Sequence, residues 1–472
     1  MNKKVSMIAF VAMLGIFLLG TFNVPAIATE SSTNALPTTI KLCGVFPISQ
    51  RPDAGPDRRD GFLMAIDEIN AQTGADRILP TGVTLQGIVK DDQNTAAGGT
   101  AAAQSCISDG ADLVIGSSGS TVSAAMAAVL TPNKIIQISY ASSSPALSDR
   151  SKYPYFMRNV ASDADQGVAV ANLVQAFGWT KGATINTDDS YGTGLVSVFK
   201  ANFNQTSGNK LATEQTFAPG ASDVSAQVQA IADAKPQFVL LHAIDKDAKT
   251  VFKKAYDLGI AGSDSNIAWI ITDGSSSTAT FEGDANVKAA MQHVIGTTPT
   301  PLSTDSASKY TTFNNSWWSV SSCGSQDPCG AARTNANPNS YAPFAYDSVY
   351  VAAKGIAAAD TVDHTQSDKL LTALYNVSFT GASGVISFNS KGELNGRFDY
   401  VTLVGDSYST FGTWELGSLP TFTMKTLVLP GGQTLVQGFR GTTGTSSAAS
   451  PGFEYLALLL GIGAYVVIRK KK

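Results

Sequence analysis

The most constraining feature of this sequence is a repeated alternation of short apolar runs with longer segments of helical periodicity. The first two apolar runs, residues 39–48 and 83–92, flank a segment at residues 57–72 whose apolar positions recur on one helical face. Further strands are expected at residues 111–116, 134–140, 183–186, 237–241 and 268–272, and further helices at residues 96–108, 120–130, 167–177, 194–204, 225–234 and 246–259. Strands that alternate with helices predict an α/β fold with doubly wound parallel sheets. Because the alternation restarts after Arg158, we expect two similar α/β units in tandem.

The composition is that of a globular protein with more than one domain. The chain has 472 residues, of which 43% are hydrophobic and 15% charged. A formal net charge of −4 disfavours nucleic-acid binding, which needs a cationic surface. Three histidines and four cysteines leave little material for a metal centre, and we expect no metal or other cofactor.

The first residues have the pattern of a secretory signal peptide, which we place at residues 1–28. Lys3 and Lys4 precede an apolar run at residues 7–20, and the small residues at 26–28 offer a cleavage site. An uncleaved membrane anchor is the alternative, but the apolar run is short for a bilayer. We therefore expect an exported protein.

The C-terminal end of the chain also has features of a membrane-associated segment. Residues 441–450 form a Gly/Ser/Thr-rich stretch that predicts a flexible tether. Residues 451–472 read Pro-Gly-Phe, an apolar run and a basic end, and we expect a C-terminal membrane anchor or sorting signal there. This segment resembles archaeal C-terminal sorting signals. The expected location is extracytoplasmic, at the outer face of the cell membrane.

The four cysteines form two candidate pairs. Cys323 and Cys329 flank a short polar segment, which predicts a local disulfide loop. Cys43 lies in an apolar strand and Cys106 near the end of a helix, so the fold would have to bring them together. Both a disulfide and two buried free thiols remain open for that pair.

An ordered set of motifs resembles the type I periplasmic-binding family. The motifs are at residues 114–123, 138–149, 155–167, 178–180, 188–194, 272–274, 384–406 and 411–416. They are similar to the leucine/isoleucine/valine-binding proteins of ABC importers and to the ectodomains of metabotropic glutamate-type receptors. The resemblance implies two lobes joined by three crossovers, near residues 158–163, 296–301 and 380–387. Lobe 1 would comprise residues 36–158 plus 300–380, and lobe 2 residues 159–299 plus 381–430.

A free amino acid has a carboxylate and an ammonium on one carbon, and the first of these needs hydrogen-bond donors. The segment at residues 116–121 leaves a strand and starts a helix, so its backbone N–H groups and the hydroxyls of Ser120 and Thr121 can hold a carboxylate. A plain helix cap is the alternative. The resemblance assigns Ser143 to both the carboxylate and the ammonium, and gives Ser142 a supporting role. A Ser/Pro turn is the alternative there.

The ammonium needs negative charge, which the resemblance places on Asp163 and Asp273. Paired carboxylates in a desolvated cleft neutralise a cation that is otherwise costly to bury. Taken alone, Asp163 could be a helix cap and Asp273 a turn residue. The resemblance also places the ring of Tyr191 over the ligand, where it would attract the ammonium. A packed loop aromatic is the alternative for Tyr191.

The expected side chain of the ligand is inferred from one position at which this sequence differs from its relatives. Relatives that bind acidic amino acids carry a lysine where this sequence has Tyr341, so we expect a neutral or branched-chain amino acid. Arg51, Arg58 and Arg59 could favour an acidic ligand, but a solvated rim is the simpler interpretation of all three.

The resemblance implies capture of an amino acid for ABC permease subunits, without catalysis. The sequence lacks HExxH, GxSxG and GxxxxGK[ST] motifs, which disfavours an enzyme. Two alternatives stay open. The first is a surface sensor ectodomain for the same ligand, and the second is a binder of another small solute such as an amide or urea.

Overall fold

The computed structural model describes residues 36–52, 54–299, 308–319, 338–423, 426–428, 434–436 and 440–441. The predicted signal peptide, the 323–329 cysteine loop and the C-terminal segment at 451–472 lie outside the described residues, as does the tether beyond Gly441. Within the described residues, no helix is both long enough and apolar enough to cross a membrane.

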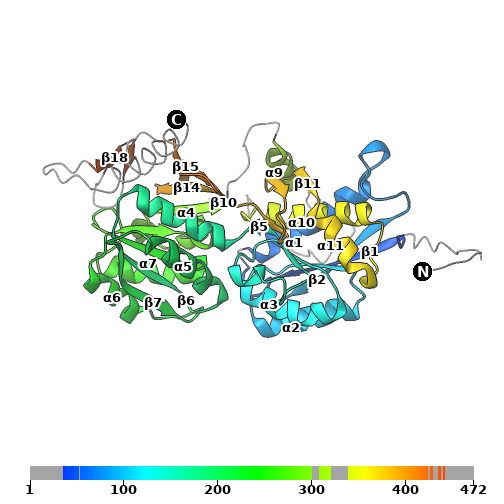
Figure 1. The fold of residues 1–472 in the computed structure, drawn as a ribbon, viewed down its shortest axis with the longest axis horizontal. Coiled ribbons are helices and arrows are strands. Elements are labelled where there is room, and N and C mark those ends of the chain that lie inside the picture. The colour runs from blue at the N-terminus through cyan, green and yellow to red at the C-terminus, as the bar shows by residue number, and fades with distance from the viewer. Residues whose placement is uncertain are drawn as a thin grey trace, which may run out of the picture. The chain divides into compact units, whose positions relative to one another are not determined.

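A six-stranded parallel sheet organises the first lobe, in the strand order β13-β5-β4-β3-β1-β2. Figure 1 labels β1, β2 and β5 of this sheet. Its strands are β1 (Thr39–Phe46), β2 (Thr84–Asp91), β3 (Leu113–Ile115), β4 (Gln137–Ser139), β5 (Phe156–Ala161) and β13 (Glu393–Leu394). Its helices are α1 (Gly55–Ala71), α2 (Ala96–Ser108), α3 (Ser120–Leu130), α9 (Lys309–Ser319), α10 (Ala342–Ala359) and α11 (Ser367–Tyr375). We use "first lobe" for this sheet and these helices.

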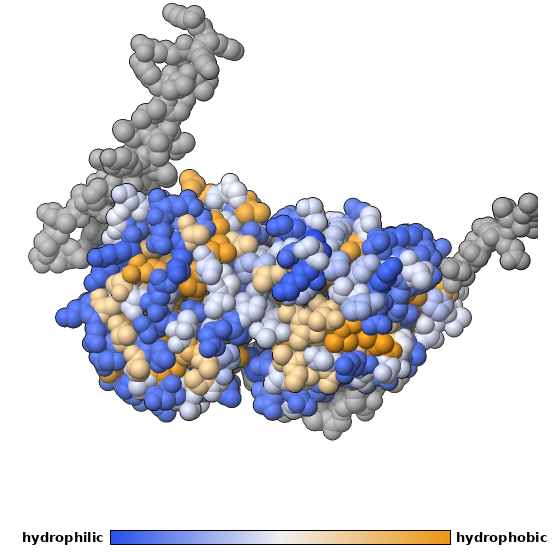
Figure 2. All heavy atoms as spheres, turned by 60° about the horizontal axis from the view of Figure 1, so that its bottom comes forward, coloured by the Kyte–Doolittle hydropathy of each residue, from blue (hydrophilic) through white to orange (hydrophobic). Residues whose placement is uncertain are grey.

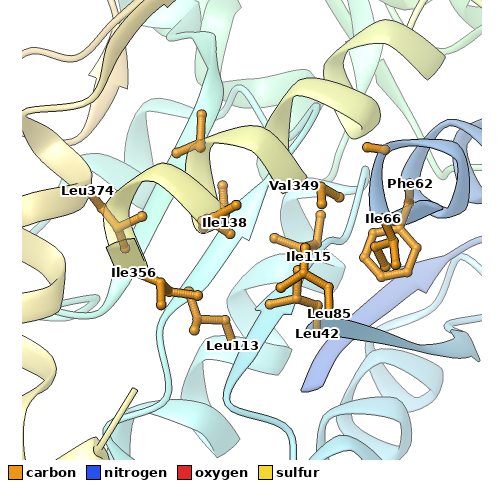
Figure 3. Packing of buried hydrophobic residues seen from close by; sticks show 14 of the residues in the cluster. Leu42, Phe62, Ile66, Leu85, Leu113, Ile115, Ile138, Val349, Ile356 and Leu374 are labelled. Atoms are coloured by element: carbon orange, nitrogen blue, oxygen red, sulfur yellow. The ribbon is translucent and has the colours of Figure 1, made fainter. Parts of the chain in front are cut away.

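Strand β1 shows why helices cover both faces of this sheet. Successive side chains of a strand point to opposite faces. Ile40 and Leu42 therefore pack with α1 and α10 in one buried cluster, part of which is drawn in Figure 3. Cys43 and Val45 pack with α2 and α3 in another. The strand is apolar on both faces, as expected for a parallel sheet between two helical layers.

An eight-stranded sheet organises the second lobe, in the order β16-β15-β14-β10-β9-β8-β6-β7. Its strands are β6 (Lys181–Thr187), β7 (Lys210–Phe217), β8 (Phe238–His242), β9 (Ala268–Ile271), β10 (Ile295–Pro299), β14 (Arg397–Val404), β15 (Ser407–Glu415) and β16 (Thr421–Phe422). Its helices are α4 (Asp163–Ala176), α5 (Ser190–Phe203), α6 (Ser225–Ala234), α7 (Asp245–Asp257) and α8 (Ala285–Ala290). The five strands β10, β9, β8, β6 and β7 are parallel. Strands β14, β15 and β16 pair antiparallel and make the sheet mixed.

Two further small sheets complete the described strands. Strands β11 (Ser378–Thr380) and β12 (Val385–Ser387) form an antiparallel pair. Strands β17 (Thr426–Val428), β18 (Thr434–Val436) and β19 (Arg440–Gly441) form the other. On the face drawn in Figure 2, hydrophilic residues are interspersed with smaller apolar patches, which is typical of exposed protein surfaces.

The chain passes between the two sheets near the expected places, with one shift. It leaves β5 and enters α4 at Ser162, and it leaves the second sheet after β10. The third passage lies between β13 and β14, later than the expected residues 380–387, which form the β11–β12 hairpin instead. Residues 393–394, expected in the second lobe, pair with β5 in the first.

A disulfide joins Cys43 on β1 to Cys106 on α2, with a Cα–Cα distance of 5.8 Å. Both residues are fully buried in the cluster between the sheet and the two helices α2 and α3. The structure thus resolves the open question for this pair in favour of the disulfide. The bond ties helix α2 to strand β1, and the loop that follows β1 leads into the site described next.

Candidate functional site

A cavity of about 220 Å³ lies between residues of the two lobes. We call it the first cavity. Ser120 and Thr121 line it from the start of α3, and Tyr191 lines it from the start of α5. Asp273 follows β9, and Tyr341 immediately precedes α10. The lining thus gathers helix N-termini and strand carboxyl ends, which is where open parallel sheets bind ligands.

The wall formed by α3 offers backbone donors. The N-cap of α3 is Gly119, and no described side chain caps its first turn, so the alternative role of Ser120 as a cap is wrong. The Ser120 hydroxyl instead accepts a hydrogen bond of 3.1 Å from the Ser144 N–H. The first N–H groups of a helix have no partner within the helix, and they attract anions. Thr121 is exposed beside them at the cavity.

In the serine turn after β4, the hydroxyls of Ser142 and Ser143 bind different partners. The Ser143 hydroxyl donates to Asp163 Oδ2 at 2.9 Å. The Ser142 hydroxyl lies 2.8 Å from Ser123 Oγ and 3.1 Å from the Ser117 carbonyl, within the first lobe. Neither serine is among the residues lining the first cavity. Ser142 is therefore held by contacts within the first lobe, and its supporting role at the ligand stays a prediction.

A buried arginine that the sequence analysis missed holds this turn in place. Arg158 Nη1 donates to the carbonyls of Ser142 and Ser144, at 3.1 and 2.9 Å. Its Nη2 pairs with Glu393 at 2.6 Å, and the Arg158 side chain is fully buried. Glu393 belongs to β13, which pairs with β5 at the edge of the first sheet. Arg158 thus fixes the backbone on which Ser143 stands.

Asp163 is a buried acid rather than a helix cap. The N-cap of α4 is Ser162, whose hydroxyl accepts from the Ala164 N–H. Asp163 follows it with no exposed surface, and its Oδ1 has no hydrogen-bond partner among the described residues. Burial raises the pKa of Asp163 well above its ordinary value, and the nearby carboxylate of Asp273 raises it further. The carboxyl therefore resists ionisation unless a positive charge arrives.

Asp273 begins a single 3-10 turn after β9. Its negative charge acts on the carboxyl of Asp163. Its Oδ2 accepts a hydrogen bond from the phenol of Tyr341, whereas its Oδ1 is buried without a partner in the described structure. Burial raises the pKa of the Asp273 carboxyl, and the bond from Tyr341 opposes that shift. Of the two acids, Asp273 lines the first cavity, whereas Asp163 is fully buried outside its lining.

Tyr191 and His242, a residue to which the sequence analysis gave no role, lie beside the two acids. The rings of Tyr191 and His242 lie 4.0 Å apart between centroids. His242 Nδ1 is 2.7 Å from Thr272 Oγ1, and its Nε2 is 3.8 Å from Asp163 Oδ2. Burial lowers the pKa of His242 to about 3, so the ring is neutral near pH 7 and brings no cation to Asp163.

Gly274 lets the phenol of Tyr191 approach the Asp273 turn. A Cβ at Gly274 would lie 2.2 Å from the Tyr191 hydroxyl oxygen, so any larger residue would push the ring away. Burial raises the pKa of Tyr191 well above its usual value, and the charge of Asp273 adds to the shift. The phenol therefore stays protonated.

The interpretation of two arginines as a solvated rim is wrong. Arg51 and Arg58 are 8% and 6% exposed, and both line the first cavity. Arg51 pairs with Asp245 of α7 at 3.3 Å, which links the two lobes. The Arg58 guanidinium lies 5.3 Å from the ring centre of Tyr341. The third, Arg59, pairs with the neighbouring Asp60 and is not among the lining residues.

The described residues hold no group of three or more His, Cys, Asp or Glu side chains placed to bind a metal ion. What the arrangement offers is an anion-attracting helix start on one wall and two buried carboxylates nearby. Ser120, Tyr191 and Asp273 line the first cavity. Ser143 and Asp163 do not line it, but they are joined by a hydrogen bond, and Asp163 interacts electrostatically with Asp273. Such a set suits a small molecule with both charges.

Comparisons with known proteins agree with this picture. A family model described as "Receptor family ligand binding region" matches residues 57–406. The chain is 25% identical to glutamate receptor 3.1 of Oryza sativa subsp. japonica, over 64% of this chain and 34% of the receptor. It is 24% identical to human metabotropic glutamate receptor 8, over 79% of this chain and 49% of the receptor. The chain therefore spans about a third to a half of these receptors.

A bacterial relative matches over nearly its whole length. The leucine-, isoleucine-, valine-, threonine-, and alanine-binding protein of Pseudomonas aeruginosa is 25% identical over 80% of this chain and 93% of its own. Among solved structures, a leucine binding protein from Thermotoga maritima superposes with a TM-score of 0.67 at 18% identity, over 80% of this chain and 99% of that one. The branched-chain amino acid binding protein of Streptococcus pneumoniae in complex with isoleucine gives 0.65 at 19%, with the same coverage. The predicted type I periplasmic-binding fold is confirmed.

Proposed function

The chain belongs to the family described as the receptor family ligand binding region, and from this premise we propose that it captures a free amino acid in the first cavity. We assign the carboxylate to the first turn of α3, with Ser120, Thr121 and Ser143. We assign the ammonium to Asp163 and Asp273, with the Tyr191 ring beside it and Ser142 supporting the turn.

One observation carries the proposal. Two buried carboxylates interact at the cavity, of which Asp273 lines it and Asp163 does not. Each has an oxygen without a partner in the described structure, and the adjacent histidine is neutral. Two such groups repel each other and lose hydration, which is costly. An ammonium supplies three N–H donors and one positive charge, and it removes both costs. A helix start for the carboxylate lies on the same cavity.

The charges around the cavity favour a neutral side chain. The lining includes two arginines, Arg51 and Arg58, against four aspartates. Because Arg51 already pairs with Asp245, its charge is matched within the protein. A second carboxylate on the ligand would enter an acidic surrounding, whereas an uncharged side chain would not.

We further propose that the bound amino acid is handed to ABC permease subunits, at the outer face of the membrane. The match to a bacterial binding protein over 93% of its length, at 25% identity, supports this role. In this view the two lobes, built on the six- and eight-stranded sheets, close on the ligand, and the ends at residues 1–28 and 451–472 serve export and anchoring. A sensor ectodomain is the second candidate, supported by the receptor relatives.

Calorimetry with the twenty standard amino acids tests the proposal. We expect at least one neutral amino acid to bind with a dissociation constant of about 1 μM or tighter, near −8 kcal/mol. Asp273→Ala should weaken that ligand by about 3–5 kcal/mol, because its ammonium loses a buried charge partner. The matched control is Asp264→Ala, an exposed acid outside the cavity lining. If none of the twenty binds, the proposed function is wrong. An unchanged affinity in Asp273→Ala would mean that the site is misplaced.

A further inference from the structure

A second cavity of about 180 Å³ adjoins the first. Asp273, Ser340 and Tyr341 line both, so these residues form the shared wall. The rest of its lining comes from four places that are distant in sequence: the end of β10, the start of α9, the start of α10 and the β11–β12 turn.

The lining of the second cavity is largely apolar. Pro299, Pro343, Phe344 and Ala382 contribute carbon surface, and Tyr310 adds a ring. Phe344 packs against Tyr341 with 5.4 Å between ring centroids. A dry apolar cavity of roughly 150 Å³ in another protein is large enough to hold benzene. The second cavity therefore has room for about one aromatic ring or an aliphatic group of similar size.

The wall between the cavities depends on one hydrogen bond. The Tyr341 phenol donates to Asp273 Oδ2, while Asp273 Oδ1 is buried and has no partner among the described residues. A charged N–H donor binds a carboxylate more strongly than a neutral phenol does. An ammonium at Asp273 can therefore replace Tyr341 as the donor and release its ring from the wall. The carbon that carries the ammonium would then stand at the mouth of the second cavity.

We propose that the second cavity receives the side chain of the bound amino acid and selects one aromatic ring or an apolar group of that size. The inference rests on the proposed function and adds the ligand class to it. An apolar side chain entering this cavity leaves water for a surface of rings and prolines, which stabilises the complex. In this arrangement the ammonium and the carboxylate of the ligand stay in the first cavity, and only its side chain enters the second.

Phe344 offers a direct test, because its ring lines the second cavity and it is not among the residues lining the first. Its carbonyl accepts a bond from Asn159, which any replacement keeps. We expect the wild-type protein to bind phenylalanine at least about tenfold more tightly than alanine. Phe344→Trp should fill the cavity and weaken phenylalanine about tenfold, with alanine unchanged. Phe344→Ala should enlarge the cavity and improve tryptophan relative to phenylalanine.

The matched control is Phe379→Trp, the same exchange on β11 outside both linings. Thermal melts should show that each variant is folded. Equal binding of phenylalanine and alanine by the wild-type protein would overturn the inference, and so would an equal loss of both ligands in Phe344→Trp. Those outcomes still include amino-acid binding, so they differ from a panel in which nothing binds, which would overturn the proposed function itself.

Discussion

Replacing Asp163 by asparagine should separate ligand binding from folding stability, because the native acid is costly until a cation reaches it. The side chain has no exposed surface, and its Oδ1 lacks a partner in the described structure. Asparagine keeps the shape and still accepts the 2.9 Å bond from Ser143. A buried acceptor without its partner costs about 1–3 kcal/mol, and more when it is charged, and asparagine removes the charge. We expect Asp163→Asn to raise the unfolding free energy of the ligand-free protein at pH 7 by an amount in that range.

The sign of the pH dependence follows from the direction of the pKa shift. Burial raises the pKa of Asp163 in the folded state above the ordinary value of 3.8. The folded protein therefore holds this proton more tightly than the unfolded chain, and the stability gained is fully present below pH 3.8. It is lost as the pH rises through the folded-state pKa. The advantage of Asp163→Asn should therefore be small in acid and grow toward neutral pH.

Urea unfolding of both proteins across this pH range measures the difference, and calorimetry measures binding. The variant should lose most affinity for the amino acid, since the ammonium loses a charge partner. Asp188→Asn, an exposed acid after β6, is the matched control and should change neither quantity. A variant that binds as tightly as the wild type, or that is less stable at pH 7, would refute the reasoning.

Two further predictions concern stability. Exchanging both Cys43 and Cys106 for alanine should lower the unfolding free energy by about 4 kcal/mol in urea, because the bond closes a loop of 63 residues in the unfolded chain; a loss below about 1 kcal/mol would contradict this. Arg158→Met should cost about 3–5 kcal/mol, because it leaves Glu393 buried without its partner, and changing Glu393 to glutamine in the same chain should recover part of the loss. Without such recovery, the ion pair is not what stabilises the edge of the sheet.

Periodicity predicted much of the fold, because helix and strand lengths are local properties. Helices α2, α3 and α6 begin and end at the predicted residues. Strands β5 and β7 were missed. In β7 alternate residues are exposed, as befits the edge of the sheet, so the strand lacks the continuous apolar run of its neighbours. The antiparallel end of the second sheet was also missed, since pairing direction depends on contacts distant in sequence.

The candidate site shows a similar limit. Resemblance supplied residues such as Ser143 and Asp273, which the structure brings to one place. It gave no role to Arg158, which lies inside the motif at residues 155–167, or to His242, which lies in none of the motifs, because each acts through contacts made in the buried interior. Arg58 was misjudged for the same reason: a basic residue near a loop looks solvated until α10 is seen beside it. Burial of a charge is a property of packing, and local sequence does not report it.

A crystal structure of the protein with its tightest-binding amino acid tests the central claim most directly. The account predicts that the carboxylate lies within hydrogen-bond distance of the first N–H groups of α3. It also predicts that the ammonium lies between Asp163 and Asp273, with the side chain beyond Tyr341. A ligand bound elsewhere, or one whose ammonium contacts neither acid, would contradict it.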